Sequence, residues 1–114
     1  MAVDESCYLY LLKPTRIEML TEGPTDEEAL VLGGHVDYLT RLSDEGVVHL
    51  AGRTQVNDAR TFGIVIFDAA SEEEAHALVA GDPAVKEGVM SATLYPYKIA
   101  ILGRDWRAES VGAD

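Results

Sequence analysis

The chain has 114 residues, of which 47% are hydrophobic and 25% are charged, a balance typical of a single soluble globular domain. Twenty acidic residues against nine basic ones give a formal net charge of −11. A surface this negative repels phosphate backbones and anionic lipids, so we expect no nucleic acid and no membrane among the partners. With one cysteine, no signal-peptide pattern and no apolar run of ~20 residues, the sequence predicts a cytoplasmic protein without an internal disulfide.

Alternation of apolar residues, capping signals and turn residues together predict four strands and two main helices in the order βαββαβ. The strands are expected at residues 7–13, 47–52, 61–70 and 90–102. The helices are expected at residues 26–45 and 71–81, and a short turn of helix follows at 83–88. This order is that of a split-βαβ, ferredoxin-like sandwich in the α+β class. We expect one domain over residues 1–103 and a polar C-terminal tail over 104–114, in which Trp106 is a candidate to dock on the domain.

The first main helix has recognisable signals at both ends. Thr25 and Glu28 have the spacing of a capping box, and Gly46 is a typical C-terminal glycine. Gly33 and Gly34 in its middle each weaken the helix by ~1 kcal/mol relative to alanine. Small residues there either admit a close neighbour or mark a kink, and both alternatives stay open.

The predicted sheet has one face without a cover. In a ferredoxin-like sandwich both helices lie on one side of the antiparallel sheet, and the first and third strands are central. Both of these strands are apolar at both alternating positions, so the side away from the helices is apolar as well. We therefore predict a homodimer in which two such sheets pack face to face. Pro96 in the last strand indicates an edge position or a bulge, because proline cannot donate to the ladder.

A histidine stands where an amphipathic helix would place a leucine. His35 shares one stripe of the first helix with Leu32, Leu39 and Leu42, since residues three, four and seven apart lie on the same face. The imidazole therefore points toward the sheet, where a buried polar group needs a hydrogen-bond partner. It is either a core histidine bonded to a backbone carbonyl or a histidine of a functional site.

Asp82 is the best candidate for an acid that orients this imidazole. Asp44 follows His35 on the same helix by nine residues, which places it half a turn away on the far face. Asp82 follows the second helix, and both helices pack on the same side of the sheet. The alternative is that Asp82 only caps a helix, because an aspartate followed by proline is typical of an N-cap with Pro83 at the first helical position.

Other reactive side chains give weaker signals. No histidine or cysteine spacing matches a metal site, so we expect no metal and no cofactor. His49 lies on a strand and either lines a cavity or an interface or is structural, and His76 is expected on a solvated helix face. Four tyrosines lie on adjacent strands, where they either stack on a ring-shaped ligand or pack against their neighbours: Tyr8, Tyr10, Tyr95 and Tyr97.

Three segments, in this order and spacing, resemble the YCII-related (YciI-like) domain family: HVDYLTRLSDEGVVHLAGR, SEEEAHALVAGDPAVKEGV and LYPYK. That family has a helix histidine, an Ala-Gly pair after the second strand, an Asp-Pro pair after the second helix and a final strand ending in proline and an aromatic residue. The resemblance runs from Tyr8 to about Lys98. It implies a ferredoxin-like fold, dimers of the dimeric α+β barrel type, and a family whose members include a dehydrochlorinase of chlorinated hydroxyquinols.

Carried onto this chain, the histidine and aspartate suspected of catalysis in the family fall on His35 and Asp82. The resemblance thus implies a His-Asp dyad for general acid/base proton transfer. It favours cofactor-independent lyase or isomerase chemistry, including dehydrochlorination, on a small substrate, and the ring-modifying relatives make an aromatic substrate one candidate. We expect Tyr10, Gly52 and Arg53 to contact this substrate.

Two positions depart from the family pattern. Arg53 stands where relatives have proline, and it either places a cation at the mouth of a pocket, where it suits an anionic ligand, or is a surface charge. Gly33 and Gly34 replace larger residues before the histidine. A second hypothesis, from another functional class, is a non-catalytic dimeric domain for ligand binding or protein interaction, in which the histidine is retained for packing.

Overall fold

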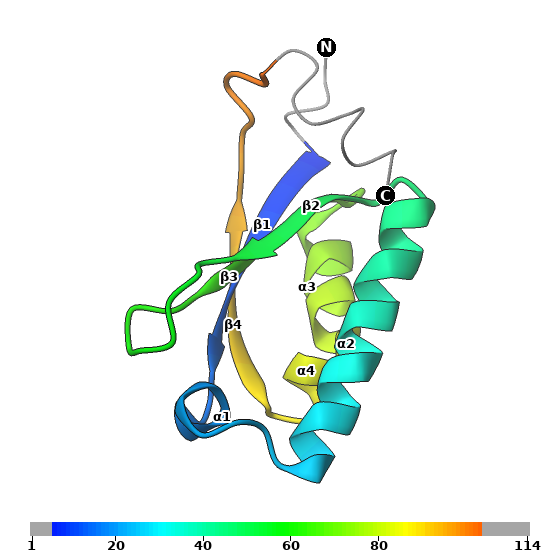
Figure 1. Ribbon diagram of the computed structural model, residues 1–114. Coiled ribbons are helices and arrows are strands. Elements are labelled where there is room, and N and C mark those ends of the chain that lie inside the picture. The colour runs from blue at the N-terminus through cyan, green and yellow to red at the C-terminus, as the bar shows by residue number, and fades with distance from the viewer. Residues whose placement is uncertain (1–5, 104–114) are drawn as a thin grey trace.

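The computed structural model describes residues 6–103 and contains eight elements in that range. The predicted tail, with Trp106, lies outside the described residues. Figure 1 shows a four-stranded sheet with α2, α3 and α4 on one side of it, and α1 near one end of β1. The elements are β1 (Cys7–Pro14), α1 (Glu18–Thr21), α2 (Asp26–Asp44), β2 (Val48–Arg53), β3 (Gly63–Asp68), α3 (Glu72–Gly81), α4 (Pro83–Lys86) and β4 (Met90–Pro96).

The strands pair antiparallel in the order β2-β3-β1-β4. This confirms the predicted ferredoxin-like α+β fold, with the first and third strands at the centre and the proline-containing strand at an edge. The expected extent of β4 to residue 102 is wrong, because the strand ends at Pro96. Its partner β1 begins at Cys7, and the last backbone bond between them runs from Tyr97 N to Cys7 O at 3.0 Å. Beyond that point no strand within residues 6–103 lies beside β4 to pair with it.

Helix α2 begins and ends where its capping signals predict. The Thr25 hydroxyl accepts from Glu28 N at 3.1 Å, and Thr25 N donates to the Glu28 carboxylate at 2.9 Å, which completes the capping box. At the other end, Gly46 has a φ of 81°, a conformation that glycine adopts without strain. The helix continues unbroken through Gly33 and Gly34. A Cβ on Gly34 would lie 3.6 Å from Pro83, so this glycine faces α4 as a close neighbour.

Helix α1 is an element that sequence reasoning missed. It has only four residues, and Ile17 at its N-cap makes no side-chain capping bond. The sequence therefore carries no capping signal at this place. Its Met19 is buried, so this short helix nonetheless packs into the domain. In the part of the chain that the structure describes, no helix is both long and apolar enough to cross a lipid bilayer.

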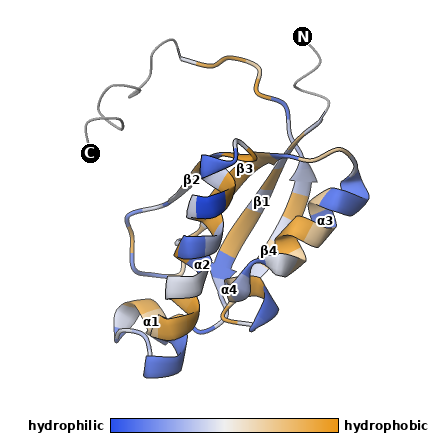
Figure 2. Ribbon diagram, turned by 90° about the vertical axis from the view of Figure 1, so that its right-hand side faces the viewer, coloured by the Kyte–Doolittle hydropathy of each residue, from blue (hydrophilic) through white to orange (hydrophobic). Residues whose placement is uncertain are grey.

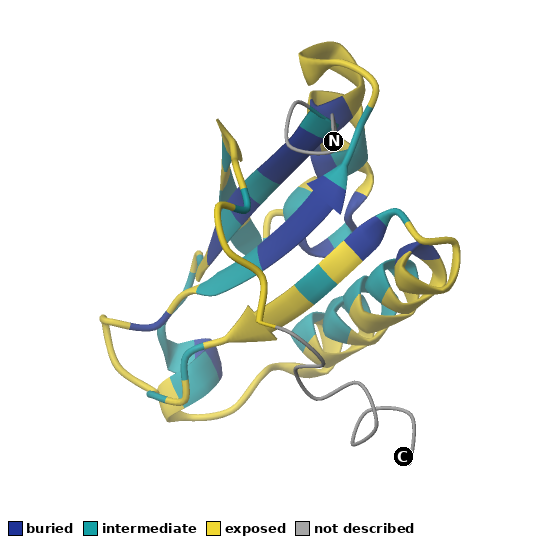
Figure 3. Ribbon diagram, turned by 90° about the horizontal axis from the view of Figure 1, so that it is seen from above, coloured by how far each residue is buried: buried dark blue, intermediate teal, exposed yellow. Residues whose placement is uncertain are grey.

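The core lies between the sheet and the helices. Tyr8, Tyr10 and Leu12 of β1 alternate toward the helical side, and Val65 and Phe67 of β3 stand opposite Tyr10 and Tyr8. Figure 2 shows apolar residues concentrated along these two strands, and Figure 3 shows that they carry most of the buried residues of the sheet. The central strands thus form the floor against which α2, α3 and α4 pack.

The opposite face of the sheet is also apolar. The alternate residues of β1, β3 and β4, which point away from the helices, lie beside one another on this face because of the strand register. None of the described helices covers this face (Figure 1). These residues are Leu9, Leu11, Ile64, Ile66 and Tyr95.

Candidate active site

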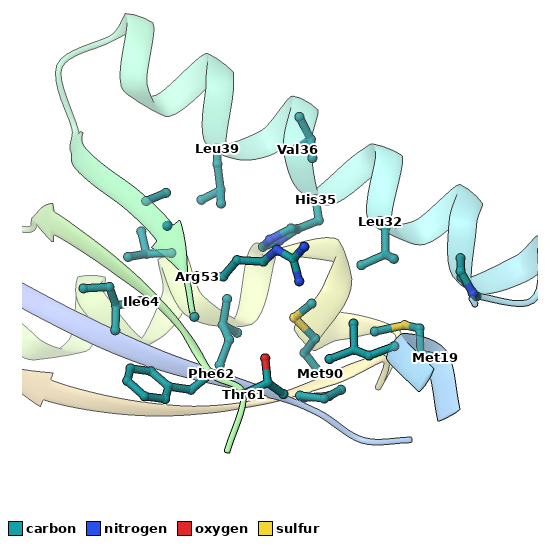
Figure 4. A pocket seen from close by; sticks show the side chains of 18 residues that line it. Met19, Leu32, His35, Val36, Leu39, Arg53, Thr61, Phe62, Ile64 and Met90 are labelled. Atoms are coloured by element: carbon teal, nitrogen blue, oxygen red, sulfur yellow. The ribbon is translucent and has the colours of Figure 1, made fainter. Parts of the chain in front are cut away.

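A cavity of about 480 Å³ lies between α2 and the sheet, with α1 closing one end. This volume is within the ~300–1,000 Å³ range of small-molecule sites. Its walls are mostly apolar, and Leu32, Val36 and Leu39 of α2 form one side. Figure 4 shows His35 among them, directed into the cavity from the helix. The cavity therefore combines a mostly apolar lining with one imidazole.

His35 is held through one ring nitrogen. Its Nδ1 lies 2.7 Å from Asp82 Oδ1 and 2.9 Å from Asp82 Oδ2, and its side chain is 13% exposed. An ionised carboxylate only accepts hydrogen bonds, so Nδ1 carries the proton and donates it to Asp82. Nε2 is then the nitrogen left without a partner, on a residue that lines the cavity. The structure thus brings together the two residues that the sequence singled out.

Asp82 is fully buried and lies where α3 gives way to α4. Its side chain caps α4 by accepting from Ala84 N at 3.0 Å, while it also accepts from His35. Capping and pairing were alternatives in the sequence, and here one carboxylate does both. Pro83 at the first helical position leaves Ala84 N as the capped amide.

Tyr10 supplies a third donor to the same carboxylate. Its hydroxyl donates to Asp82 Oδ2 at 2.8 Å, and its side chain is 0% exposed. Burial, and then the adjacent Asp82 carboxylate, raise the pKa of Tyr10 above its ordinary value, so the hydroxyl stays protonated and remains a donor. Tyr10 is not among the residues that line the cavity. It lies behind His35 and Asp82 rather than facing a ligand, which differs from its expected role as a substrate contact.

Gly52 and Arg53 both line the cavity from β2. Figure 4 shows Arg53 extending from the strand toward His35 on the opposite wall. The side chain of Arg53 is exposed and makes no hydrogen bond or ion pair within residues 6–103. The structure thus places these two predicted contact residues at the cavity and Tyr10 away from it.

The other two histidines lie outside the cavity. His49 Nε2 lies 3.0 Å from Asp68 Oδ2 at the end of the sheet, where both side chains are half-exposed. His76 Nε2 lies 3.8 Å from Glu72 on the exposed surface of α3. Among the described residues, no cluster of histidine, cysteine and carboxylate side chains could hold a metal ion.

Sequence reasoning missed the Tyr10 hydrogen bond and the wall that α1 contributes. Met19 and Leu20 of α1 line the cavity together with Pro24. No local signal marks either feature, because both depend on contacts between segments far apart in the chain. The alternating pattern of β1 does put Tyr10 on the helical face, which is the one clue that the sequence offers.

Comparison with known proteins identifies the family and the fold of this chain. The family model of the YCII-related domain matches residues 8–97, so the chain belongs to that family. Among solved structures, the chain is similar to 5-chloro-2-hydroxyhydroquinone dehydrochlorinase from Burkholderia phenoliruptrix AC1100, in complex with 2,5-dihydroxybenzoquinone. The identity is 21% over 80% of this chain and 93% of that one, with a TM-score of 0.57, which establishes a shared fold. No curated protein matches the chain.

Proposed function

We propose that this protein is a cofactor-independent enzyme that transfers a proton on a small ligand, with His35 as general base and acid. The observation that carries the proposal is the contact between His35 Nδ1 and the fully buried Asp82 carboxylate, at 2.7 Å, on the wall of a ligand-sized cavity. A reactive imidazole needs a fixed tautomer, an accessible second nitrogen and a counter-charge. Asp82 supplies the first and the third.

Apart from His35 and Asp82, the chemistry requires only the substrate. With Nδ1–H donated to Asp82, the lone pair of Nε2 takes a proton from a carbon or oxygen of the ligand. The bond that held the proton supplies an electron pair, which forms a double bond. In a lyase reaction, the new double bond displaces a leaving group, which departs with its bonding electrons while the proton stays on Nε2. In an isomerase reaction, the imidazolium returns the proton to another carbon of the ligand. Asp82 offsets the positive charge of the imidazolium in the meantime.

Two comparisons support this class of reaction. The chain belongs to the YCII-related family, and a structural neighbour is a dehydrochlorinase. Loss of hydrogen chloride requires a base that accepts the proton while chloride departs, which is the role proposed for His35. A chlorinated hydroquinone is therefore a rational first substrate to assay.

Nitrogen-15 NMR of the imidazoles tests the proposed tautomer without any substrate. In the neutral ring, His35 should carry its proton on Nδ1, because Nδ1 contacts Asp82. His49 is an internal control, since it meets Asp68 through Nε2 and should show the opposite tautomer. Asp82→Asn should change the His35 signals and leave those of His49 unaltered. A His35 ring protonated on Nε2 in the wild-type protein contradicts the proposal.

A turnover assay tests the catalytic role itself. Chlorinated hydroquinones are assayed for chloride release, and unchlorinated ring compounds for exchange of carbon-bound hydrogen in heavy water. Wherever turnover is found, His35→Gln should reduce it by a factor of about 10²–10⁴, the usual contribution of a general base. His49→Gln, the matched control outside the cavity, should leave it unchanged. Equal activity of the His35 variant and the wild type rejects His35 as the base.

The second candidate is a non-catalytic dimeric domain that binds a ligand or a partner. The apolar row on the uncovered sheet face, Leu9, Leu11, Ile64 and Ile66, favours it. It is preferred if neither hydrogen exchange nor chloride release is detected, and if His35→Gln and Asp82→Asn alter only stability.

Under either function we propose that two copies associate through this face. The face is apolar at its centre in a chain whose net charge is −11, so the same face of a second copy offers a matching apolar surface. A two-fold axis would place Leu11 and Ile64 of one copy against the same residues of the other.

A further inference from the structure

The cavity is unusual in its charges. Of the 18 residues that line it, only His35 and Arg53 are titratable, and none is acidic. Twenty acidic residues are spread over the 114 residues of the chain, so their absence from this lining is a marked local deviation. A ligand in the cavity therefore meets one permanent cation, one imidazole and apolar surface.

Arg53 also differs from the other described arginines. Arg16 lies 2.7 Å from Glu28, Arg60 lies 2.8 Å from Asp58, and Arg41 lies 3.9 Å from Glu45. Arg53 alone within residues 6–103 has no carboxylate partner, although the molecule is strongly acidic. Its five donors are therefore available to a molecule that enters the cavity.

The position of Arg53 directs those donors inward. On β2 it stands opposite Gly63 of β3, which has no side chain to occupy the space above the strand. Ala51, two residues earlier on the same side of β2, also lines the cavity with a small side chain. Figure 4 shows the guanidinium reaching into the opening, toward His35. An anionic group bound there would place the rest of a ring-sized ligand between Arg53 and His35.

We infer that the ligand of this cavity is a compact, mostly apolar ring bearing an oxygen anion, a carboxylate or an ionised phenol, and that Arg53 binds this anion. The inference rests on the proposed function for the use of the site and adds the class of substrate. The molecule as a whole repels anions, so a cation at the mouth is needed to accept one. The ring fits the apolar walls, and the imidazole is left for the chemistry.

Binding of simple probes tests this inference independently of turnover. Benzoate is compared with benzamide, and 4-nitrophenolate with 4-nitroanisole, each by NMR titration of the wild-type chain in low salt. We expect the anion of at least one pair to bind about 2–5-fold more tightly than its neutral counterpart, the gain typical of a partly exposed guanidinium–oxyanion pair. Shifts should centre on the amides of His35, Leu39 and Arg53. The pair with the larger ratio identifies the kind of anion.

Three variants localise the effect. Arg53→Gln should abolish the preference for the anion, and Arg53→Lys should restore part of it, because lysine keeps the charge without the planar donors. Arg41→Gln is the matched control, since it removes the same charge from the outer surface of α2 and should leave the preference intact. Added salt should weaken the binding of the anions and not of the neutral probes.

Several results overturn the inference: equal affinity of anion and neutral probe, no binding of any probe, or loss of the preference in Arg41→Gln as well as Arg53→Gln. These outcomes are separate from failure of the proposed function. If the protein prefers anions but His35 is catalytically inert, the inferred ligand class is supported and the proposed enzymatic function is rejected. If turnover depends on His35 but the protein shows no preference for anions, the proposed enzymatic function is supported and the inferred ligand class is rejected.

Discussion

Tyr10 donates a hydrogen bond of 2.8 Å to Asp82, although 72 positions separate the two residues. Both side chains are completely buried, so neither end of the bond contacts solvent. Asp82 also accepts from His35 and from Ala84 N. These donors replace the water that a buried carboxylate loses, and they come from the centre of the sheet, from α2 and from α4.

Replacing Tyr10 by phenylalanine should weaken this arrangement while preserving the shape of the core. Tyr10→Phe leaves Asp82 Oδ2 with only its longer contact to His35. We therefore expect the free energy of unfolding, measured by urea denaturation, to fall by about 1–3 kcal/mol. Because Tyr10 acts through Asp82, any turnover should lose kcat, with little change in KM and an altered pH profile.

Tyr8→Phe is the control for that experiment. Tyr8 lies on the same face of β1, and its hydroxyl makes no bond to any residue in the range 6–103. Loss of the Tyr8 hydroxyl should therefore lower the free energy of unfolding by less than loss of the Tyr10 hydroxyl does. Equal effects of the two substitutions would mean that the Asp82 bond contributes nothing of its own.

Glu28 should make stability depend on acidity. Its hydrogen bonds with Arg16, first, and with the Thr25 backbone hold the pKa of Glu28 near 2, below its ordinary value of 4.5. A lowered folded-state pKa adds stability above the ordinary pKa, and this stability is lost as the pH falls toward 2. The melting temperature of the wild-type protein should therefore exceed that of Glu28→Gln at about pH 7. The difference between the two melting temperatures should close between about pH 4.5 and pH 2.

Glutamine keeps the third position of the capping box, while it removes the charge and one of the two oxygens that accept from Arg16. Adding salt at neutral pH should also narrow the gap, since the Arg16–Glu28 pair lies at the surface. A gap that is constant across the acid range would show that the two proteins differ for reasons other than this ion pair.

Two glycines in helices should respond oppositely to alanine. A Cβ on Gly33 meets nothing within 4 Å, so Gly33→Ala should stabilise the fold by up to about 1 kcal/mol in urea denaturation. A Cβ on Gly81 would lie 2.9 Å from the Tyr38 hydroxyl, which donates to Leu78 O at 2.6 Å. Gly81→Ala should therefore destabilise. If both substitutions stabilise the fold, helix propensity outweighs the contact with Tyr38 at Gly81.

The proposed association through the sheet is tested by light scattering during size exclusion. Leu11→Asp places a charge in the centre of the uncovered face and should convert a dimer to a monomer. Leu30→Asp is the control, because Leu30 is 80% exposed on α2, away from that face. A wild-type chain that elutes as a monomer, or a Leu11→Asp variant that stays dimeric, rules this interface out.

The predictable part of the fold is the part with local signals. Thr25, Glu28 and Gly46 mark the ends of α2, and apolar residues on both faces of β1 and β3 identify the central strands. Helix α1 has no capping side chain, so nothing in its sequence distinguishes it from a loop. The overextended β4 shows the same limit, because composition favours a strand past Pro96 while the end of its partner decides where pairing stops.

The site divides in the same way. Helical spacing directs His35 inward, and the position of Asp82 after α3 makes a contact with His35 geometrically reasonable. The Asp-Pro pattern by itself favours a cap, and the sequence could not reveal that one carboxylate serves both purposes. The hydroxyl of Tyr10 meets Asp82 only once β1 and α4 have been packed together, so no pattern within either segment indicates it.

The two sides of the cavity differ in how they are anchored. His35 is held through Asp82 by β1 and α4, whose Tyr10 and Ala84 are fully buried, whereas α1 and the end of β2 with Arg53 form the outer wall. Exposed positions of the outer wall, such as Arg53, can therefore be redesigned to accept other molecules at little risk to folding, whereas the buried Met19 cannot. Changes behind the imidazole would alter reactivity and foldability at once, so that half is the poorer target for engineering.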